Sequence, residues 1–196
     1  MTERRAELAR TAARLFAERG FHGTSMGDIA EAMGIQKASL YSLTSSKQQL
    51  LYDVVSSGAQ AFQTALDDVE DDAHAVERVR QALRGHLRVV ALQLDTATVF
   101  TREWRYLEGE LLSEFVGERR RYEERWRELF REGVERGELR IDLRPSDAAL
   151  VVLSAANWAY TWLPSDADTD ALADRFVAIV VDGIGGYSAP RTANAP

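Results

Sequence analysis

The feature that most constrains the fold of this chain is the stretch of residues 24–47, in which two short helical patterns meet at a glycine. In the first pattern, Ile29, Ala30 and Met33 share one face of a helix with 3.6 residues per turn. Gly34 ends this pattern, because glycine readily adopts the left-handed conformation that a tight turn requires. Two short helices joined in this way are typical of a helix-turn-helix, whose second helix lies in the major groove of DNA.

The same stretch contains the side chains that we expect to contact DNA. Thr24 or Ser25 can N-cap the first helix, and either is expected to contact a phosphate at the N-terminus of that helix. The second pattern, residues 36–43, opens with polar side chains placed for base edges and ends with groups suited to phosphate. The predicted base contacts are Gln36, Lys37 and Ser39, the predicted phosphate contacts are Tyr41 and Lys47, and Ser42 completes the predicted DNA-binding set.

Several short motifs keep a fixed spacing across this region: Phe21-His22-Gly23-Thr24-Ser25-Met26, Asp28-Ile29-Ala30, Gly34-Ile35, Leu40-Tyr41 and Ser46-Lys47. With these motifs, residues 5–51 resemble the N-terminal domain of TetR-type bacterial repressors. The resemblance implies a three-helix DNA-binding head on a helical body that binds an effector. The family usually carries an aromatic-His-Phe run after the tyrosine, where this chain has Ser42-Leu43-Thr44. This departure leaves open an alternative function, a carrier or sensor of lipid-like ligands that has lost operator binding.

The distribution of charge agrees with DNA binding at one end only. The whole chain of 196 residues has a formal net charge of −7. Residues 1–49 hold seven Lys/Arg and five Asp/Glu, so they carry +2, whereas the remainder carries −9. A mildly basic head on an acidic body suits a protein that contacts phosphate with its head alone.

Composition excludes several classes of protein. The chain has no cysteine, so disulfides, thiol nucleophiles and thiolate metal sites are impossible. No apolar run approaches the length of a membrane span, and no signal peptide is recognisable, so we expect a cytoplasmic protein. The three histidines, His22, His74 and His86, lack metal-ligand spacing. We therefore expect no metal, no cofactor and no catalytic residues, and a protein that is not an enzyme.

Apolar periodicity predicts helices and no strands along the rest of the chain. We expect an all-α protein of about nine helices, with a helix-turn-helix domain over 1–47, an effector-binding and dimerisation domain over 48–187, and a flexible tail over 188–196. The expected helices cover 3–19, the two elements of the helix-turn-helix, 46–70, 76–94, 100–107, 111–136, 148–163 and a last helix that starts at Thr169 or Asp170 and includes 172–184.

The predicted helix over 148–163 is apolar nearly all round, so it must be buried on most sides. Together with the helix over 172–184, it offers the spare apolar surface that pairing of two chains requires. One helix-turn-helix contacts too few bases to be selective, so two heads must act together on a pseudo-palindromic operator. We therefore expect a two-fold homodimer that pairs through these helices as a four-helix bundle.

Aromatic side chains are concentrated in the C-terminal part, which contains all four tryptophans. Trp158 and Trp162 are four residues apart, so a continuous helix would place them on one face as a wall of a cavity. Asn157 would face another neighbour, and Arg102 and Arg105 could hold a carboxylate or phosphate at the mouth. The predicted effector set is Phe100, Arg102, Trp104, Arg105, Tyr122, Trp126, Asn157, Trp158 and Trp162. The competing interpretation is that the rings are filled core and the arginines are solvated.

A second resemblance covers residues 99–184. It rests on Arg102-Glu103-Trp104-Arg105, the arginine-rich helix around Tyr122, the Gly137-Glu138-Leu139 turn and the Asn157-Trp158-x-Tyr160-x-Trp162 run. These residues look like the C-terminal domain of TetR-type repressors of lipid and steroid catabolism, several of which respond to acyl-CoA thioesters. The resemblance implies a ligand-responsive transcriptional repressor that binds double-stranded DNA as a dimer. An apolar effector, such as an acyl-CoA, would release it by favouring a head spacing that misfits the operator.

Overall fold

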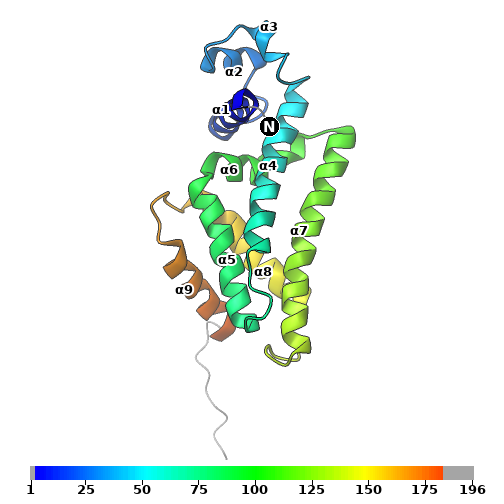
Figure 1. Ribbon diagram of the computed structural model, residues 1–196, viewed down its shortest axis with the longest axis vertical. Coiled ribbons are helices and arrows are strands. Elements are labelled where there is room, and N and C mark those ends of the chain that lie inside the picture. Colours follow the sequence, from blue (N-terminus) through cyan, green and yellow to red (C-terminus); the bar gives the residue numbers. More distant parts are fainter. Residues whose placement is uncertain (1–2, 183–196) are drawn as a thin grey trace, which may run out of the picture.

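The computed structural model describes residues 3–182 (Figure 1) and, within them, nine α-helices and no strand, which confirms the predicted all-α class. The first four helices are α1 Glu3–Arg19, α2 Met26–Ala32, α3 Lys37–Leu40 and α4 Lys47–Asp67. The others are α5 Ala75–Leu92, α6 Leu94–Arg102, α7 Gly109–Glu135, α8 Pro145–Asn157 and α9 Thr169–Asp182, with the 3-10 turns η1 Trp104–Tyr106 and η2 Trp158–Thr161.

Helices α1, α2 and α3 form a small head at one end of the molecule (Figure 1). Ser25 N-caps α2: its Oγ accepts the Asp28 backbone N–H at 3.1 Å, and the Asp28 carboxylate accepts the Ser25 N–H at 2.7 Å. Gly34 turns the chain with a φ of 64°, a left-handed value that favours glycine. Helix α3 is a single turn anchored by the buried Leu40, and it is shorter than the predicted span of 36–43.

Helix α4 connects the head to the body without a break (Figure 1). Ser46 caps its start by accepting the Gln49 N–H at 3.0 Å. The buried Leu51 and Val55 are followed two turns later by the buried Phe62, which keeps one face of the helix apolar along its length. Helix α4 packs against α1 of the head and against α5, α6 and α7 of the body. A displacement of the body can therefore reach the head through this helix.

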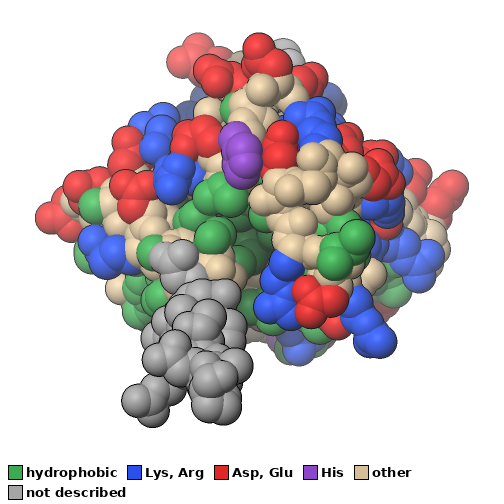
Figure 2. All heavy atoms as spheres, turned by 90° about the horizontal axis from the view of Figure 1, so that it is seen from below, with side chains coloured by type: hydrophobic (Ala, Val, Ile, Leu, Met, Phe, Trp, Pro, Cys, Tyr) green, Lys and Arg blue, Asp and Glu red, His purple; other side chains and the backbone are tan. Residues whose placement is uncertain are grey.

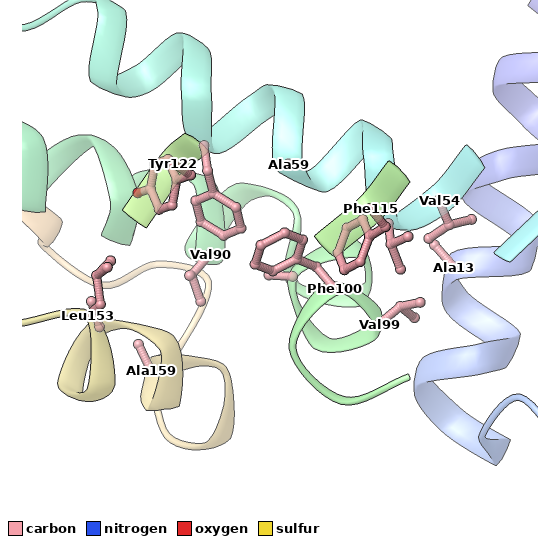
Figure 3. Close-up of a cluster of buried hydrophobic side chains, with 14 of the residues drawn as sticks. Ala13, Val54, Ala59, Val90, Val99, Phe100, Phe115, Tyr122, Leu153 and Ala159 are labelled. Carbon is pink, nitrogen blue, oxygen red and sulfur yellow. The ribbon is translucent and has the colours of Figure 1, made fainter. Parts of the chain in front are cut away.

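The core of the body is built from large aromatic side chains on three helices. Phe62 of α4 packs on Phe100 of α6 and Tyr122 of α7, with ring centroids 5.0 Å and 6.0 Å apart. Phe115 of α7 continues the cluster at 5.7 Å from Phe100, next to Val54 (Figure 3). All five side chains are buried, so this part of the body is closely packed.

Two helices of the body differ from the sequence prediction. The helix predicted over 100–107 begins earlier, at Leu94, and ends at Arg102, after which the chain continues as the turn η1. Val99 of this helix is buried, and the helix packs on α1 and α4. The helix predicted over 148–163 ends at Asn157 and continues only as the 3-10 turn η2. Pro164 prevents any helix from continuing past residue 163, since it has no N–H for a carbonyl one turn earlier and disfavours helical conformation in the residue before it.

Helices α8 and α9 carry exposed apolar side chains, which we call the α8–α9 face: Leu150, Val151, Ile179, Val180 and Val181. Leu150 and Val151 are 66% and 61% exposed. Within one chain α8 packs mainly on α7 and α9 on α5, so one side of each helix stays uncovered. The prediction that the helix over 148–163 is buried on most sides is therefore wrong for a single chain.

The far end of the molecule, opposite the head, also shows apolar side chains at its centre between charged ones (Figure 2). No helix within residues 3–182 is long and apolar enough to cross a membrane. The same residues contain no cluster of His, Asp and Glu that could hold a metal ion. The predicted end of the last helix at 184, the body boundary at 187 and the tail over 188–196 lie outside the described residues.

Candidate DNA-binding face and effector site

The outer surface of the head carries most of the predicted DNA contacts. Gln36, Lys37 and Ser39 are exposed on and beside α3, at the tip of the head (Figure 1). Gln36 begins the helix without using its side chain as a cap, so its amide remains open to solvent. Tyr41 is 49% exposed, and the exposed Ser42 donates its hydroxyl to the Ser39 carbonyl at 2.7 Å. The turn after α3 therefore presents polar groups beside those of the helix.

Thr24 and Ser25 have structural roles in the head. Thr24 is 1% exposed, and its hydroxyl lies 3.1 Å from the Leu15 carbonyl and 3.0 Å from the Gly20 carbonyl. Its side chain has no exposed surface that could contact a phosphate, so the predicted phosphate contact of Thr24 is wrong. Ser25 is exposed, but its Oγ caps α2 and the Asp28 carboxylate lies beside it. These hydrogen bonds hold the pKa of Asp28 below its ordinary value, which keeps a negative charge at this helix end.

Lys47 lies at the start of α4 and contacts the ring of Phe21, with its Nζ 4.1 Å from the ring centroid. Burial lowers the pKa of Lys47 below its ordinary value, whereas the nearby Asp28 raises it. The ammonium is therefore held against the head rather than extended into solvent. Its predicted phosphate contact remains a prediction.

The end of α6 and the turn η1 hold the head to the body. Glu103 is 5% exposed, and its Oε2 accepts the backbone N–H of Phe21 at 2.7 Å. The rings of Phe21 and Tyr106 are stacked with centroids 6.1 Å apart, and Gln48 of α4 donates to the Tyr106 carbonyl at 2.9 Å. Glu103 was not predicted to connect the two parts, because a lone glutamate beside arginines looks like a surface residue in the sequence.

The predicted effector residues do not form one group. Phe100, Tyr122 and Trp126 are buried in the core of the body. Trp158 and Trp162 are 60% and 45% exposed, because the chain leaves the α-helix at Asn157 and the two residues no longer share a helix face. The expected wall formed by these two tryptophans is therefore wrong. Asn157 is half-buried at the end of α8, and Trp104 is half-buried on η1.

The polar groups around the buried rings also differ from the prediction. Arg102 and Arg105 are exposed, and the Arg105 Nε donates to the Arg102 carbonyl at 2.9 Å. The guanidinium of Arg119 on α7 lies 4.6 Å from the centroid of the Trp104 ring and 5.9 Å from that of Phe100. Burial lowers the pKa of Arg119. Arg119, which the sequence analysis did not select, is thus the cation that lies on the predicted aromatic rings.

His86 of α5 is the least expected group in the core. It is 1% exposed and stacks on Phe62, with ring centroids 4.4 Å apart, and its Nδ1 lies 2.9 Å from the Tyr122 hydroxyl oxygen. Burial lowers its pKa to about 3, against a weaker opposing effect of the Ala156 backbone, so the imidazole is neutral at physiological pH. The Ala156 backbone lies near the His86 ring, and the Tyr122 hydroxyl lies near Trp126. In the described part of the chain, however, neither His86 Nε2 nor Trp126 Nε1 has a partner that meets hydrogen-bond geometry. The burial of His86 could have been predicted from the sequence, because His86 falls within the apolar stripe of α5.

Unpartnered polar atoms in a packed core require an explanation, since each costs about 1–3 kcal/mol relative to a hydrogen-bonded state. His86 Nε2 and Trp126 Nε1 belong to one contact network, because Tyr122 contacts both rings. A ligand with a hydrogen-bonding group among apolar atoms would satisfy them. The core around His86, Tyr122 and Trp126 is therefore the candidate effector site. Because this core is closely packed, the helices around it must move apart before a ligand can enter.

Comparison with known proteins identifies both parts of the chain. Residues 8–54 match the family model of bacterial regulatory proteins of the tetR family. Residues 72–184 match the model of the tetracyclin repressor-like C-terminal domain. The transcriptional repressor KstR2 of Rhodococcus jostii is 31% identical over 193 residues, covering 92% of this chain and 91% of the relative. KstR2 of Mycobacterium tuberculosis is 25% identical over 189 residues, covering 94% of each.

Solved structures agree with this assignment. PfmR, a TetR family transcriptional regulator from Thermus thermophilus, superposes with a TM-score of 0.87 at 27% identity, covering 94% of this chain and 99% of that one. AibR in complex with isovaleryl coenzyme A and operator DNA superposes with a TM-score of 0.81 at 29% identity, covering 91% and 98%. The chain is therefore a member of the TetR family of bacterial transcriptional regulators.

Proposed function

We propose that this protein is a repressor that binds a palindromic operator as a homodimer and is released by an acyl-CoA thioester. The observation that carries the proposal is the pair of unpartnered polar atoms, His86 Nε2 and Trp126 Nε1, within an apolar core that α4 connects to the DNA-binding head. The α8–α9 face offers apolar surface for the second chain. AibR, a similar chain whose solved complex contains isovaleryl coenzyme A and operator DNA, supports the class of effector.

The DNA contact is expected to depend on the exposed side chains of α3. Lys37 is exposed at the start of that helix, where the side chain can reach base edges in the major groove. Lys37→Ala should lower affinity for the operator by about 1–3 kcal/mol and relax sequence preference at one base position of each half-site. Binding to randomised operator sequences measures both effects. A loss of affinity that is equal for all operator sequences would instead show that Lys37 contacts a phosphate.

The effector is expected to change the environment of the core tryptophan. A long-chain or polycyclic acyl-CoA at micromolar concentration should change intrinsic fluorescence and release the protein from its operator. Free coenzyme A should do so poorly, because it lacks the apolar part that the core would bind. Trp126→Phe should remove most of the fluorescence change, whereas Trp158→Phe serves as the matched variant at an exposed position.

Outcomes of this titration separate the possibilities. If a broad panel of acyl-CoAs leaves both fluorescence and operator binding unchanged, the acyl-CoA assignment is wrong and other apolar effectors should be tested. The turn Ser42-Leu43-Thr44 favours a second candidate, a carrier or sensor of lipid-like ligands without operator binding. A gel shift against the protein's own promoter region discriminates, because the carrier would bind ligand and show no shift.

A further inference from the structure

We propose that a cleft between the head and the body is a second ligand site, for a small phosphate-bearing molecule rich in hydroxyl groups. The cleft has a volume of about 830 Å³ and is lined by α1, the turn after α3, α4 and α7. It contains none of the residues of the candidate effector site, so it is a separate site. Its volume lies within the usual range for small-molecule sites.

One wall of the cleft is a polar face of α4. Gln49, Asp53, Ser56, Gln60 and Gln63 are spaced four, three, four and three residues apart, which places them on one side of the helix. A helix side that faces neighbouring helices is ordinarily apolar. Here it presents three amides and the Ser56 hydroxyl, which can both donate and accept hydrogen bonds, together with the Asp53 carboxylate, which only accepts. Such a wall fits a ligand with many hydroxyl groups.

The carboxylates of the cleft already have neutral partners. Glu118 of α7 accepts hydrogen bonds from the Tyr52 hydroxyl at 3.2 Å and from the Ser56 hydroxyl at 3.0 Å. Asp53 accepts one from the Gln49 side-chain amide at 2.9 Å. These bonds tie both carboxylates to α4, which leaves the basic groups of the cleft without an acidic partner.

Two arginines line the same cleft, Arg5 from the head and Arg121 from the body. Neither forms an ion pair with a carboxylate of residues 3–182, although most arginines of α7 do. A guanidinium binds phosphate through two parallel charge-assisted hydrogen bonds. Both side chains are exposed on the cleft wall, so each is open to the phosphate group of a ligand that enters the cleft.

A small molecule fits this cleft better than the DNA backbone. The exposed Tyr41 and Ser42 lie at the end of the cleft near α3, where DNA is expected. From there the cleft follows α4 from Gln49 to Gln63, a distance of about 21 Å away from the recognition helix. A ligand there contacts both parts of the protein, so its binding favours the present arrangement of head and body and alters operator affinity.

The test measures binding of three probes to the full-length protein by calorimetry and thermal denaturation. AMP and ribose 5-phosphate should bind and raise the melting temperature, whereas adenosine, which lacks the phosphate, should not. Arg121→Gln should weaken binding about tenfold or more, because it removes a charge-assisted contact. Arg120→Gln is the matched control, since Arg120 is the exposed neighbour on α7 and does not line the cleft.

Each outcome decides the proposal. Binding of AMP alone identifies a nucleotide site, and binding of both phosphate probes identifies a sugar phosphate site. Either result supports the proposal if Arg121→Gln weakens binding and Arg120→Gln does not. Failure of both phosphate probes to bind the wild-type protein overturns it, and so does probe binding that Arg121→Gln leaves unchanged. So does a loss of operator affinity in Arg5→Gln and Arg121→Gln without probe binding, which would assign the cleft to DNA. Coenzyme A also carries an adenosine nucleotide, so probe binding is assigned to the cleft only when Arg121→Gln weakens it, because Arg121 lines the cleft and is not part of the candidate effector site.

Discussion

Leu150→Arg should convert the protein from a dimer to a monomer and lower its affinity for the operator about 100-fold. Leu150 is 66% exposed in the single chain and lies on the α8–α9 face with Val151 and Ile179. In a two-fold dimer the same surface of both chains meets, so one substitution introduces two arginines into an apolar interface. Each head would then bind its half-site alone and lose the gain from simultaneous binding.

Analytical ultracentrifugation and a gel shift measure the two effects together. The variant should sediment near the chain mass of 21.9 kDa, whereas the wild-type protein should sediment as a dimer at micromolar concentration. Ile141→Arg is the matched control, because Ile141 is an exposed apolar residue between α7 and α8, outside the α8–α9 face. A monomeric wild-type protein would show that the chains do not pair, and a dimeric Leu150→Arg/Ile179→Arg protein would show that they pair through another surface.

Acidification should destabilise the wild-type protein through His86, and His86→Gln should remove that contribution. Burial lowers the pKa of His86 to about 3 in the folded chain, from 6.5 in an ordinary setting. The folded state therefore favours the neutral ring. Above pH 6.5 the ring is neutral in the unfolded chain as well, so protonation of His86 does not reduce the free energy of unfolding there. As pH falls below 6.5 the unfolded chain gains a proton that the folded chain does not. The free energy of unfolding should then fall by about 1.4 kcal/mol per pH unit, or about 2.7 kcal/mol at pH 4.5.

Urea denaturation between pH 7.5 and 4.5, at one fixed protein concentration, tests this prediction. Fixed concentration is needed because the stability of a dimer depends on it. The carboxylates titrate in both proteins. The difference between the wild-type protein and His86→Gln in the slope of unfolding free energy against pH therefore measures the contribution of His86 alone. His22→Gln is the control, because His22 is exposed. If the unfolding free energies of the wild-type protein and His86→Gln changed in parallel with pH, His86 would bind its proton equally well in the folded and unfolded states.

The helix-turn-helix and the fold class were predictable because their signals are local. Ser25, Gly34 and Ser46 act on their own segments of the backbone, as N-cap, left-handed turn and N-cap respectively. Regular apolar spacing likewise predicted α1, α5 and α7 within a few residues. Such features depend on neighbours along the chain, so they can be recognised without knowing what packs on them.

The candidate effector site was only partly predictable, because burial depends on packing between distant segments. Sequence alone could not show that Trp126 is fully buried and Trp158 exposed, since both are aromatic residues in helical stretches. It also gave no reason to pair His86 of α5 with Tyr122 of α7, which lie 36 residues apart and meet at 2.9 Å. Glu103 similarly gained its partner, the Phe21 N–H, from 82 residues away.

The sequence by itself thus determined the all-α class, the helix-turn-helix and the family, through caps, turns and periodicity that act within a few residues. The tertiary structure decided which polar groups are buried, which arginines lie on aromatic rings and where a cleft opens between head and body. The physical reason is that desolvation and side-chain contacts depend on the summed positions of several helices. A small change in where α8 ends was enough to move Trp158 and Trp162 from the predicted wall to the surface.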